Sequence, residues 1–374
     1  MRKFVIKPFK QNAAIDPAGA QVIWKKLQKA IHHVHNENAS SLSFEELYRF
    51  SYNLVLHKHG KLLYSGVKQE VATHLEKVSA EVVTAPNSKL LELIQQKWER
   101  HKITMRMIRD IMMYMDRTYV SQTRSMPVYD MGMNAFRVKI LRAGSVSRRV
   151  RDILLAEIAA SRAGEPSDSL AVRHAVQMLV DLRVGTNNIY EAEFEGAFLK
   201  ATQEFYELES ARFLAENTCA QYLVKAQRRL QQEQRRVDEC LHATSKSALM
   251  NIVETKLVFN HAVVLVEMAG SGVKHMLVHN QVEDLARMYS LFRPIHRKHA
   301  WGGDLDGGAS AGTGGSSSRR PGRGHTPLEV LRQTVKAHVT AEGRQLVEDQ
   351  EQTKNPVEFV RRLLGIRQKY AHIV

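Results

Sequence analysis

The sequence predicts an all-α protein, and three observations support this fold class. Residues 167–293 contain no proline and few glycines, so helices joined by short turns can run through the whole stretch. Apolar side chains recur every three or four positions across residues 202–241, which is the helical period. Helix-start signals stand at Ser43, Thr326 and Asn355.

Each start signal has a physical basis. The segments SFEE from Ser43 and TPLE from Thr326 match the capping box, in which a hydroxyl and a carboxylate bind each other's free backbone amides. Pro327 and Pro356 directly follow a capping residue, and proline suits the first helical position because the amide that it lacks would have no partner there. We therefore expect helices to begin at or next to these residues.

Length, charge and cysteine content restrict the class of protein. The 374 residues allow two or three compact units or one extended array of repeats, and 44% hydrophobic residues are typical of a globular chain. Cys219 and Cys240 are the only cysteines, which excludes a disulfide scaffold and a four-thiolate zinc site. The N-terminus lacks the apolar stretch of a secretory signal, and no long uncharged apolar window occurs. We expect a protein of the cytoplasm and nucleus without a membrane span.

Residues 302–325 differ in composition from the rest of the chain. They hold nine of the 21 glycines and three consecutive serines, and such a segment cannot bury enough apolar surface to offset the entropy of ordering. We expect a disordered loop here. Because apolar periodicity resumes at Leu328 and Leu331, the loop is either an insertion between helices of one unit or a linker between domains.

Sequence patterns of catalysis and metal binding are absent. The chain contains no phosphate-binding glycine loop, no dinucleotide fingerprint, no HExxH and no CxxC. His57 and His59 face different sides of a helix, and so do Cys240 and His242, so neither pair meets at one site. The histidines within residues 32–35 are interpreted as a solvated helix end. We predict a non-enzymatic protein with no cofactor and no metal.

The net charge of +15 raises a second possibility, a basic helical protein that binds nucleic acid or an acidic membrane surface. Its best support is the run of residues 137–151, which carries six arginines and lysines and no acid. The run has no aromatic residues inside it for base stacking and matches no known reader motif. We favour a solvated basic surface and do not expect nucleic acid as a partner.

Aromatic residues form the strongest local pattern. One expected helix carries two apolar stripes, and these stripes consist of Phe44, Tyr48, Tyr52 and Val55 on one side and Leu47, Phe50 and Leu54 on the other. A helix with two apolar faces needs two partners. The first stripe is either buried in the core or exposed as a protein interface, where tyrosine is enriched. A second helix, within residues 105–120, carries Tyr114, Arg117 and Tyr119 beside a row of methionine and isoleucine.

Five ordered segments carry a family resemblance. They read SLSFEELYRFSYNLVLHKHGKLLYSGV from Ser41, MIRDIMMYMDRTYV from Met107, YEAEFEGAFLKATQEFYELES from Tyr190, FLAENTCAQYLVKA from Phe213 and NPVEFVRRLL from Asn355. These segments are similar to the first, second and third repeats of the cullin family. Within the family, the combination most resembles the members that bind adaptors through BTB domains.

The resemblance implies an elongated, solenoid-like rod of three five-helix cullin repeats, in agreement with the all-α prediction. The repeats would cover residues 19–147, 148–265 and 266–374, with an extension over residues 1–18 before them and the loop at 302–325 inside the third. The first repeat would be the one that binds the adaptor.

The same resemblance implies a function. The chain would be a non-catalytic scaffold that holds BTB-domain substrate adaptors of a cullin-RING ubiquitin ligase in ubiquitin-dependent protein degradation. In the family the RING-binding region follows the third repeat, so we expect it to be absent from this chain and expect the ligase machinery to associate only indirectly. The adaptor-facing positions that match are Phe44, Glu45, Tyr48, Tyr52, Arg117 and Tyr119, with a looser match at Phe4, Ile6 and Phe9.

Overall fold

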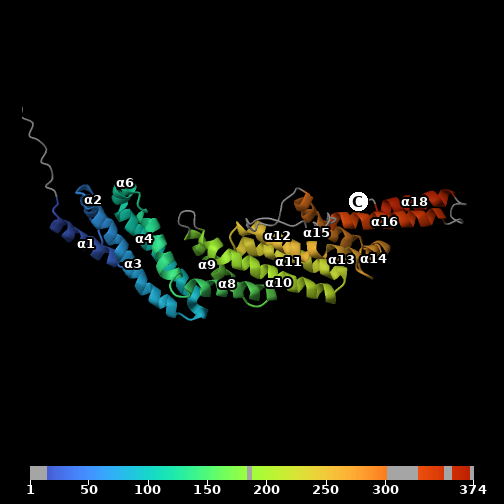
Figure 1. Ribbon diagram of the computed structural model, residues 1–374, viewed down its shortest axis with the longest axis horizontal. Helices are drawn as coiled ribbons and strands as arrows, with labels where there is room; N and C mark the ends of the chain where they lie inside the picture. Colours follow the sequence, from blue (N-terminus) through green and yellow to red (C-terminus); the bar gives the residue numbers. More distant parts are fainter. Residues whose placement is uncertain (1–14, 183–187, 301–326, 349–355, 371–374) are drawn as a thin grey trace, which may run out of the picture. The chain divides into compact units, whose positions relative to one another are not determined.

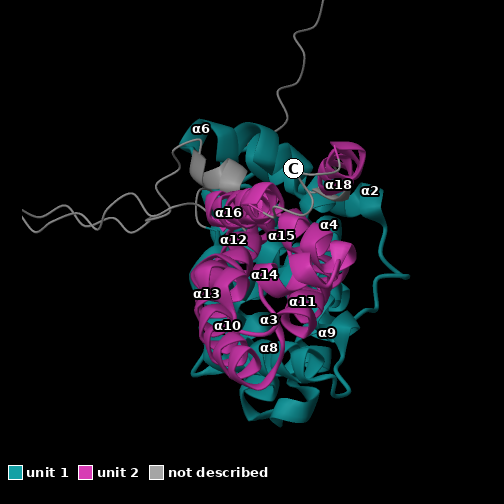
Figure 2. Cartoon of the chain, turned by 90° about the vertical axis from the view of Figure 1, so that its right-hand side faces the viewer, with its two compact units in different colours: residues 1–196 teal, residues 197–374 magenta. Residues whose placement is uncertain are grey.

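A computed structural model describes residues 15–182, 188–300, 327–348 and 356–370 (Figure 1). These residues form helices and turns, with no β-strand among them, so the all-α prediction is confirmed. The chain divides into two compact units, Met1–Gly196 (unit 1) and Ala197–Val374 (unit 2) (Figure 2). The boundaries of three repeats stay a prediction, and the loop expected at residues 302–325 lies outside the described residues.

Unit 1 is built on four helices that pack against one another near its start. Helix α1 packs on α2 and α3, and α4 packs on α7 and α9. The elements of unit 1 are α1 (Pro17–His35), α2 (Phe44–Leu56), α3 (Gly60–Thr84), α4 (Asn87–Ile111), α5 (Met113–Met115), the π-helical turn η1 (Asp116–Val120), α6 (Ser121–Thr123), α7 (Val128–Phe136), the π-helical turn η2 (Arg137–Leu141), α8 (Val146–Ala163), α9 (Ser169–Asp181) and the π-helical turn η3 (Glu191–Glu195).

The predicted helix starts agree with the observed ones. Helix α2 begins at Phe44, and the Ser43 hydroxyl accepts a hydrogen bond from the Glu46 amide at 3.4 Å, which is half of the expected capping box. Two helices of unit 2 begin at Pro327 and Pro356, as predicted, although the residue that precedes each of them lies outside the described residues.

The core of unit 1 holds large side chains at close approaches of the helices. Trp98 of α4 and Phe136 of α7 are buried and meet edge to face, with ring centroids 5.1 Å apart. Gly66 of α3 lies under the Trp24 ring, where an added Cβ would come within 2.3 Å of a ring carbon. Glycine is therefore required at position 66 for α1 to pack this closely on α3.

Unit 2 begins with a helical pair. The apolar period over residues 202–241 continues through both helices, but the chain turns between them at Thr218, whose side chain forms a complete capping box with Gln221. The elements of unit 2 are α10 (Gly196–Glu216), α11 (Cys219–Cys240), α12 (Ser245–Leu257), the 3₁₀ turn η4 (Phe259–His261), α13 (Ala262–Glu267), α14 (Val273–Val278), α15 (Val282–Ala300), α16 (Pro327–Glu348) and α18 (Pro356–Tyr370).

Both cysteines are free and buried in unit 2, which agrees with the absence of a disulfide framework. The Cys219 thiol donates to the Leu265 carbonyl, and the Cys240 thiol donates to the Arg236 carbonyl, each at 3.3 Å. Burial raises the pKa of Cys219 to about 12 and that of Cys240 to about 11. Both thiols are therefore protonated at neutral pH and unreactive as nucleophiles.

One stretch of the described chain, Ser245–Glu267, is long and apolar enough to cross a membrane by length and composition, with a mean hydropathy of 1.4. It is divided by the turn η4, and Leu249, Val253 and Leu257 pack in the interior of unit 2. The core helix of a globular protein passes the same test, so this stretch alone is weak support for a span.

Candidate functional site

The two apolar stripes of helix α2 differ in how far they are buried. Leu47 and Leu54 are buried, and Phe50 is partly covered by Lys26 of α1, whose Nζ lies 5.1 Å from the ring centroid. This stripe therefore packs on the body of unit 1. On the opposite stripe no aromatic side chain is buried, since Phe44 is exposed and Tyr48 and Tyr52 are half-buried.

The surface stripe begins at Phe44, whose side chain is 52% exposed at the first position of the helix. Tyr48 follows one turn later, with its ring stacked on Phe44 at a centroid distance of 6.3 Å. Glu45 is also exposed in this first turn, where a carboxylate interacts favourably with the helix dipole. These three predicted residues thus lie together near the start of α2, with Phe44 and Glu45 exposed and Tyr48 half-buried.

Tyr52 continues the stripe but rests on a second element. Its ring lies 4.5 Å from the ring of Tyr114 in α5, and α2 packs on α5. Neither the Tyr48 nor the Tyr52 hydroxyl has a hydrogen-bond partner within the described part of the chain. We call the set Phe44, Glu45, Tyr48, Tyr52 and Tyr114 the α2 surface. Sequence reasoning left Tyr114 out because its contact with Tyr52 joins residues far apart in the chain.

The two predicted residues on η1 behave differently from each other. Arg117 is exposed, and no ion pair holds it among the described residues. Tyr119 is half-buried and packs on α3, where an added Cβ on Gly60 would lie 2.5 Å from the Tyr119 ring and where the Tyr64 ring lies 6.2 Å away. Tyr119 thus contacts α3 through Gly60 and the Tyr64 ring and not the tyrosines of the α2 surface.

A carboxylate fixes the segment that carries these residues. Asp116 accepts hydrogen bonds from the Val128 amide at 3.1 and 3.3 Å, so it caps the start of α7. Burial raises the pKa of the Asp116 carboxyl, while the bond from Val128 opposes that rise. Tyr64 donates to the Met126 carbonyl at 2.9 Å and ties the same turn to α3.

The N-terminal candidates Phe4, Ile6 and Phe9 lie outside the described residues. The first described residue, Ile15, has its carbonyl oxygen 2.9 Å from His59 Nε2, in the turn between α2 and α3. Asp16 then caps α1 by accepting from the Gly19 amide at 2.9 Å. The chain that enters α1 is therefore held at the end of α2.

Histidine and cysteine do not assemble a metal centre in the described part of the chain, where no group of three potential ligands lies close enough to hold an ion. His242 Nδ1 lies 2.8 Å from the Thr244 hydroxyl, and Cys240 bonds to a backbone carbonyl, so these two do not pair. The interpretation of residues 32–35 as a solvated helix end is wrong for His35. Both of its ring nitrogens are buried, because α3 and α4 cover the end of α1.

The basic run of residues 137–151 does not form one cationic face. Lys139 is paired with Glu76 at 2.7 Å, and Arg151 is paired with Asp152 at 3.2 Å. Arg149 donates to the Val83 and Ala85 carbonyls and fastens α8 to the end of α3. Lys139 and Arg149 thus bind α3 and the residue that follows it, and Arg151 binds a carboxylate of its own helix, which leaves fewer cations free for phosphate.

Comparison with known proteins gives consistent relatives. A family model described as "Cullin alpha solenoid domain" matches residues 24–374. The chain is 38% identical over 373 residues to Cullin-3B of Arabidopsis thaliana, covering 100% of this chain and 47% of that protein. It is 34% identical over 359 residues to Cullin-3 of Dictyostelium discoideum (96% and 43%) and 33% identical over 376 residues to Cullin-3 of Caenorhabditis elegans (100% and 45%).

The chain spans about half the length of these curated relatives. The five motifs, the helical architecture and the match along nearly the whole sequence all agree with one another, and the predicted resemblance is confirmed. The chain belongs to the cullin family.

Proposed function

We propose that this chain is the adaptor-holding part of a cullin scaffold of a ubiquitin ligase, located in the cytoplasm and nucleus, and that it binds BTB-domain adaptors through the α2 surface. Membership of the family and the cullin-3 relatives along the chain support the scaffold role. A scaffold of this kind needs no active site of its own, because it acts by holding a bound substrate near the transfer machinery.

One observation supports the location most directly. Phe44 is about half exposed beside Tyr48, although Leu47 and Leu54 of the opposite stripe are buried. Large aromatic side chains gain free energy when a partner covers them, and tyrosine is enriched at the centres of protein interfaces. The Tyr48 and Tyr52 hydroxyls remain able to bond a partner, because neither is used within the described part of the chain.

A substitution at Phe44 tests the surface without disturbing the fold. Because Phe44 buries little within the chain, Phe44→Ala should leave helical circular dichroism unchanged and weaken binding to purified BTB-domain proteins about thirtyfold, which is about 2 kcal/mol. The matched control is Leu208→Ala in α10, whose side chain is 75% exposed in unit 2. Titration calorimetry measures both. Equal affinities of the Phe44 and Leu208 variants would contradict the proposed location.

Tyr52 allows a finer test, because its ring and its hydroxyl have separate roles. Tyr52→Phe keeps the ring contact with Tyr114 and removes a hydroxyl that bonds nothing within the described residues. We expect unchanged thermal stability and an affinity lower by about fivefold, since a hydrogen bond is worth about 1 kcal/mol net. An affinity equal to that of the unmodified chain would remove Tyr52 from the hydrogen-bonding part of the interface.

Salt separates this function from polyanion binding. Binding through packed aromatic side chains changes little between low and moderate salt, whereas binding to phosphates falls steeply because condensed counterions are released. We expect the affinity for a BTB domain to vary by less than about threefold between about 50 and about 300 mM sodium chloride. A loss of a hundredfold or more would favour the alternative of nucleic acid or an acidic membrane.

A further inference from the structure

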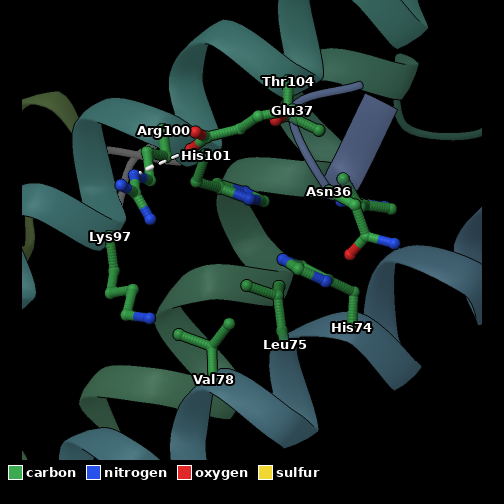
Figure 3. A pocket seen from close by; sticks show the side chains of 10 residues that line it. Asn36, Glu37, His74, Leu75, Val78, Lys97, Arg100, His101 and Thr104 are labelled. Atoms are coloured by element: carbon green, nitrogen blue, oxygen red, sulfur yellow. Dashed lines mark ion pairs between the residues drawn. The ribbon is translucent and has the colours of Figure 1, made fainter. Parts of the chain in front are cut away.

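A polar pocket lies in unit 1 between the end of α1, α3 and α4, away from the residues of the α2 surface (Figure 3). Its volume is about 270 Å³, and its polar lining includes Asn36, Glu37, His74, Lys97, Arg100 and His101. His35 also lines it and stacks on His74, with ring centroids 4.1 Å apart and planes at 17°. Figure 3 shows the His74 and His101 rings reaching into the same space. We call this the histidine pocket.

Cationic groups outnumber acids around the pocket. Glu37 is the only acid in its lining, and Arg100 Nε engages it at 2.8 Å. Lys97 is paired with Glu81 of α3, which is outside the lining. Two further groups act on the histidines from α1 and α3, namely His32 and Lys77. Helix α7 packs on His101, with the Gly132 carbonyl oxygen 2.9 Å from His101 Nε2 and the Phe136 ring centroid 5.2 Å from that of His101.

The pKa of each of the three histidines, His35, His74 and His101, lies below its usual value. The Gly132 carbonyl can only accept a hydrogen bond, so the proton of the neutral His101 ring lies on Nε2. The other ring nitrogen, Nδ1, then carries a lone pair that can accept a proton. Burial first, and then the neighbouring His74, lower the pKa of His101 to about 4 and that of His35 to about 3. Burial and the adjacent lysines also lower the pKa of His74. Protonation is unfavourable because burial and the neighbouring cations oppose an added charge, while Glu81 acts in the other direction on His74 alone.

We propose that the histidine pocket binds a small oxyanion of the sulfate and phosphate type, together with a proton that an imidazole takes up from solvent. Its volume lies below the roughly 300–1,000 Å³ of pockets for drug-sized ligands and suits one small ion with a few waters. Because Arg100 and Lys97 are paired with Glu37 and Glu81, an oxyanion would bind by competing with these carboxylates for the two cations. The only bond that changes is the new N–H bond on a ring nitrogen.

Sulfate is the probe, because its charge is constant between pH 6.0 and 7.5 and any pH dependence then belongs to the protein. The full 374-residue chain is unfolded by heat in 10 mM sodium sulfate and in sodium chloride of equal ionic strength. At pH 6.0 we expect sulfate to raise the midpoint by about 2 °C more than chloride does, with a smaller difference at pH 7.5. Calorimetry in two buffers of different ionisation heat should show proton uptake on binding.

Variants assign the effect to the pocket. Arg100→Gln and His74→Gln should each abolish the difference between sulfate and chloride, whereas Lys68→Gln, an exposed cation of α3 outside the lining, should retain it. Arg100 is 51% exposed, so its variant folds even if the His74 variant does not. The proposal is overturned by a missing sulfate effect at pH 6.0, by an equal effect at both pH values, or by an effect that survives Arg100→Gln.

Discussion

Helix α2 of unit 1 and helix α10 of unit 2 carry similar rows of aromatic residues, but the two rows differ in burial. In α10, Phe198 and Tyr206 are fully buried, and the Tyr206 hydroxyl donates to Glu233 at 2.7 Å. In α2, Phe44 is exposed and Tyr48 is half-buried. A buried tyrosine needs a partner for its hydroxyl, and unit 2 supplies one from α11.

The difference shows what makes an aromatic row part of a core. Glu233 is itself buried, and it accepts from Arg236 one turn later at 2.7 Å, so the phenol, the carboxylate and the guanidinium satisfy one another. Helix α5 offers α2 no such group. It offers the ring of Tyr114, whose centroid lies 4.5 Å from that of Tyr52, and the Tyr52 hydroxyl has no hydrogen-bond partner within the described part of the chain.

The largest expected effect is in the buried row. Tyr206→Ala should destabilise unit 2 by about 4 kcal/mol, because it leaves a cavity and removes a partner of buried Glu233. Tyr206→Phe should cost less, about 2 kcal/mol, since the ring remains. Denaturant unfolding followed by circular dichroism measures both, and BTB binding of the folded protein should not change. A Tyr206→Ala protein as stable as the unmodified chain would show that the two rows are equivalent.

Acid should lower the free energy of unfolding of unit 1. The folded pKa of His101 is about 4 and its ordinary value is 6.5, so the unfolded chain binds more protons below pH 6.5. Stability is therefore complete above pH 6.5 and is lost as the pH falls toward 4, by about 3 kcal/mol from His101 alone. Buried Trp24 and Trp98 lie in unit 1, so tryptophan fluorescence follows its unfolding.

A variant assigns this pH dependence, in buffers without sulfate or phosphate. His101→Gln replaces the ring by an amide that can also donate to the Gly132 carbonyl, but it does not titrate. We expect its stability to depend less steeply on pH between 6.5 and 4 than that of the unmodified chain. Identical slopes for the two proteins would mean that His101 is not the group that titrates.

A smaller effect is expected where the α2–α3 turn meets Tyr119. Gly60→Ala would place a methyl group 2.5 Å from the Tyr119 ring, so the ring must shift. Overpacking of a half-buried ring should cost about 1 kcal/mol of stability. If Tyr119 contacts an adaptor, affinity for a BTB domain should fall as well. An unchanged affinity with reduced stability would restrict Tyr119 to a structural role.

The smallest effect should follow deletion in the glycine-rich segment. Removing about fifteen residues within 302–325 should shift the thermal midpoint by no more than a few degrees, because loop entropy grows only with the logarithm of length. Adaptor binding should not change, since the α2 surface lies in unit 1 and this segment in unit 2. A large loss of stability would show that the segment packs on unit 2, and protection of its arginines from trypsin would be the matching observation.

Part of the candidate site was accessible from sequence. The spacing of Phe44, Tyr48 and Tyr52 places them on one face of any helix, and the capping signal at Ser43 sets where that helix begins. Tyr114 was not accessible as a site residue, because its role comes from a contact across more than sixty positions of chain. The interpretation of His35 as solvated failed for the same reason.

The sequence by itself determined the helical class, the positions of helix starts and the family, because these depend on local periodicity, on capping within one turn and on ordered motifs. Only the tertiary structure decided which aromatic row is covered and where histidines gather. Tyr206 contacts Glu233 only because α10 packs on α11. His35 stacks on His74, and both line one pocket with His101, only because α1, α3 and α4 pack together. Burial and pKa are properties of that packing, and no single helix contains them.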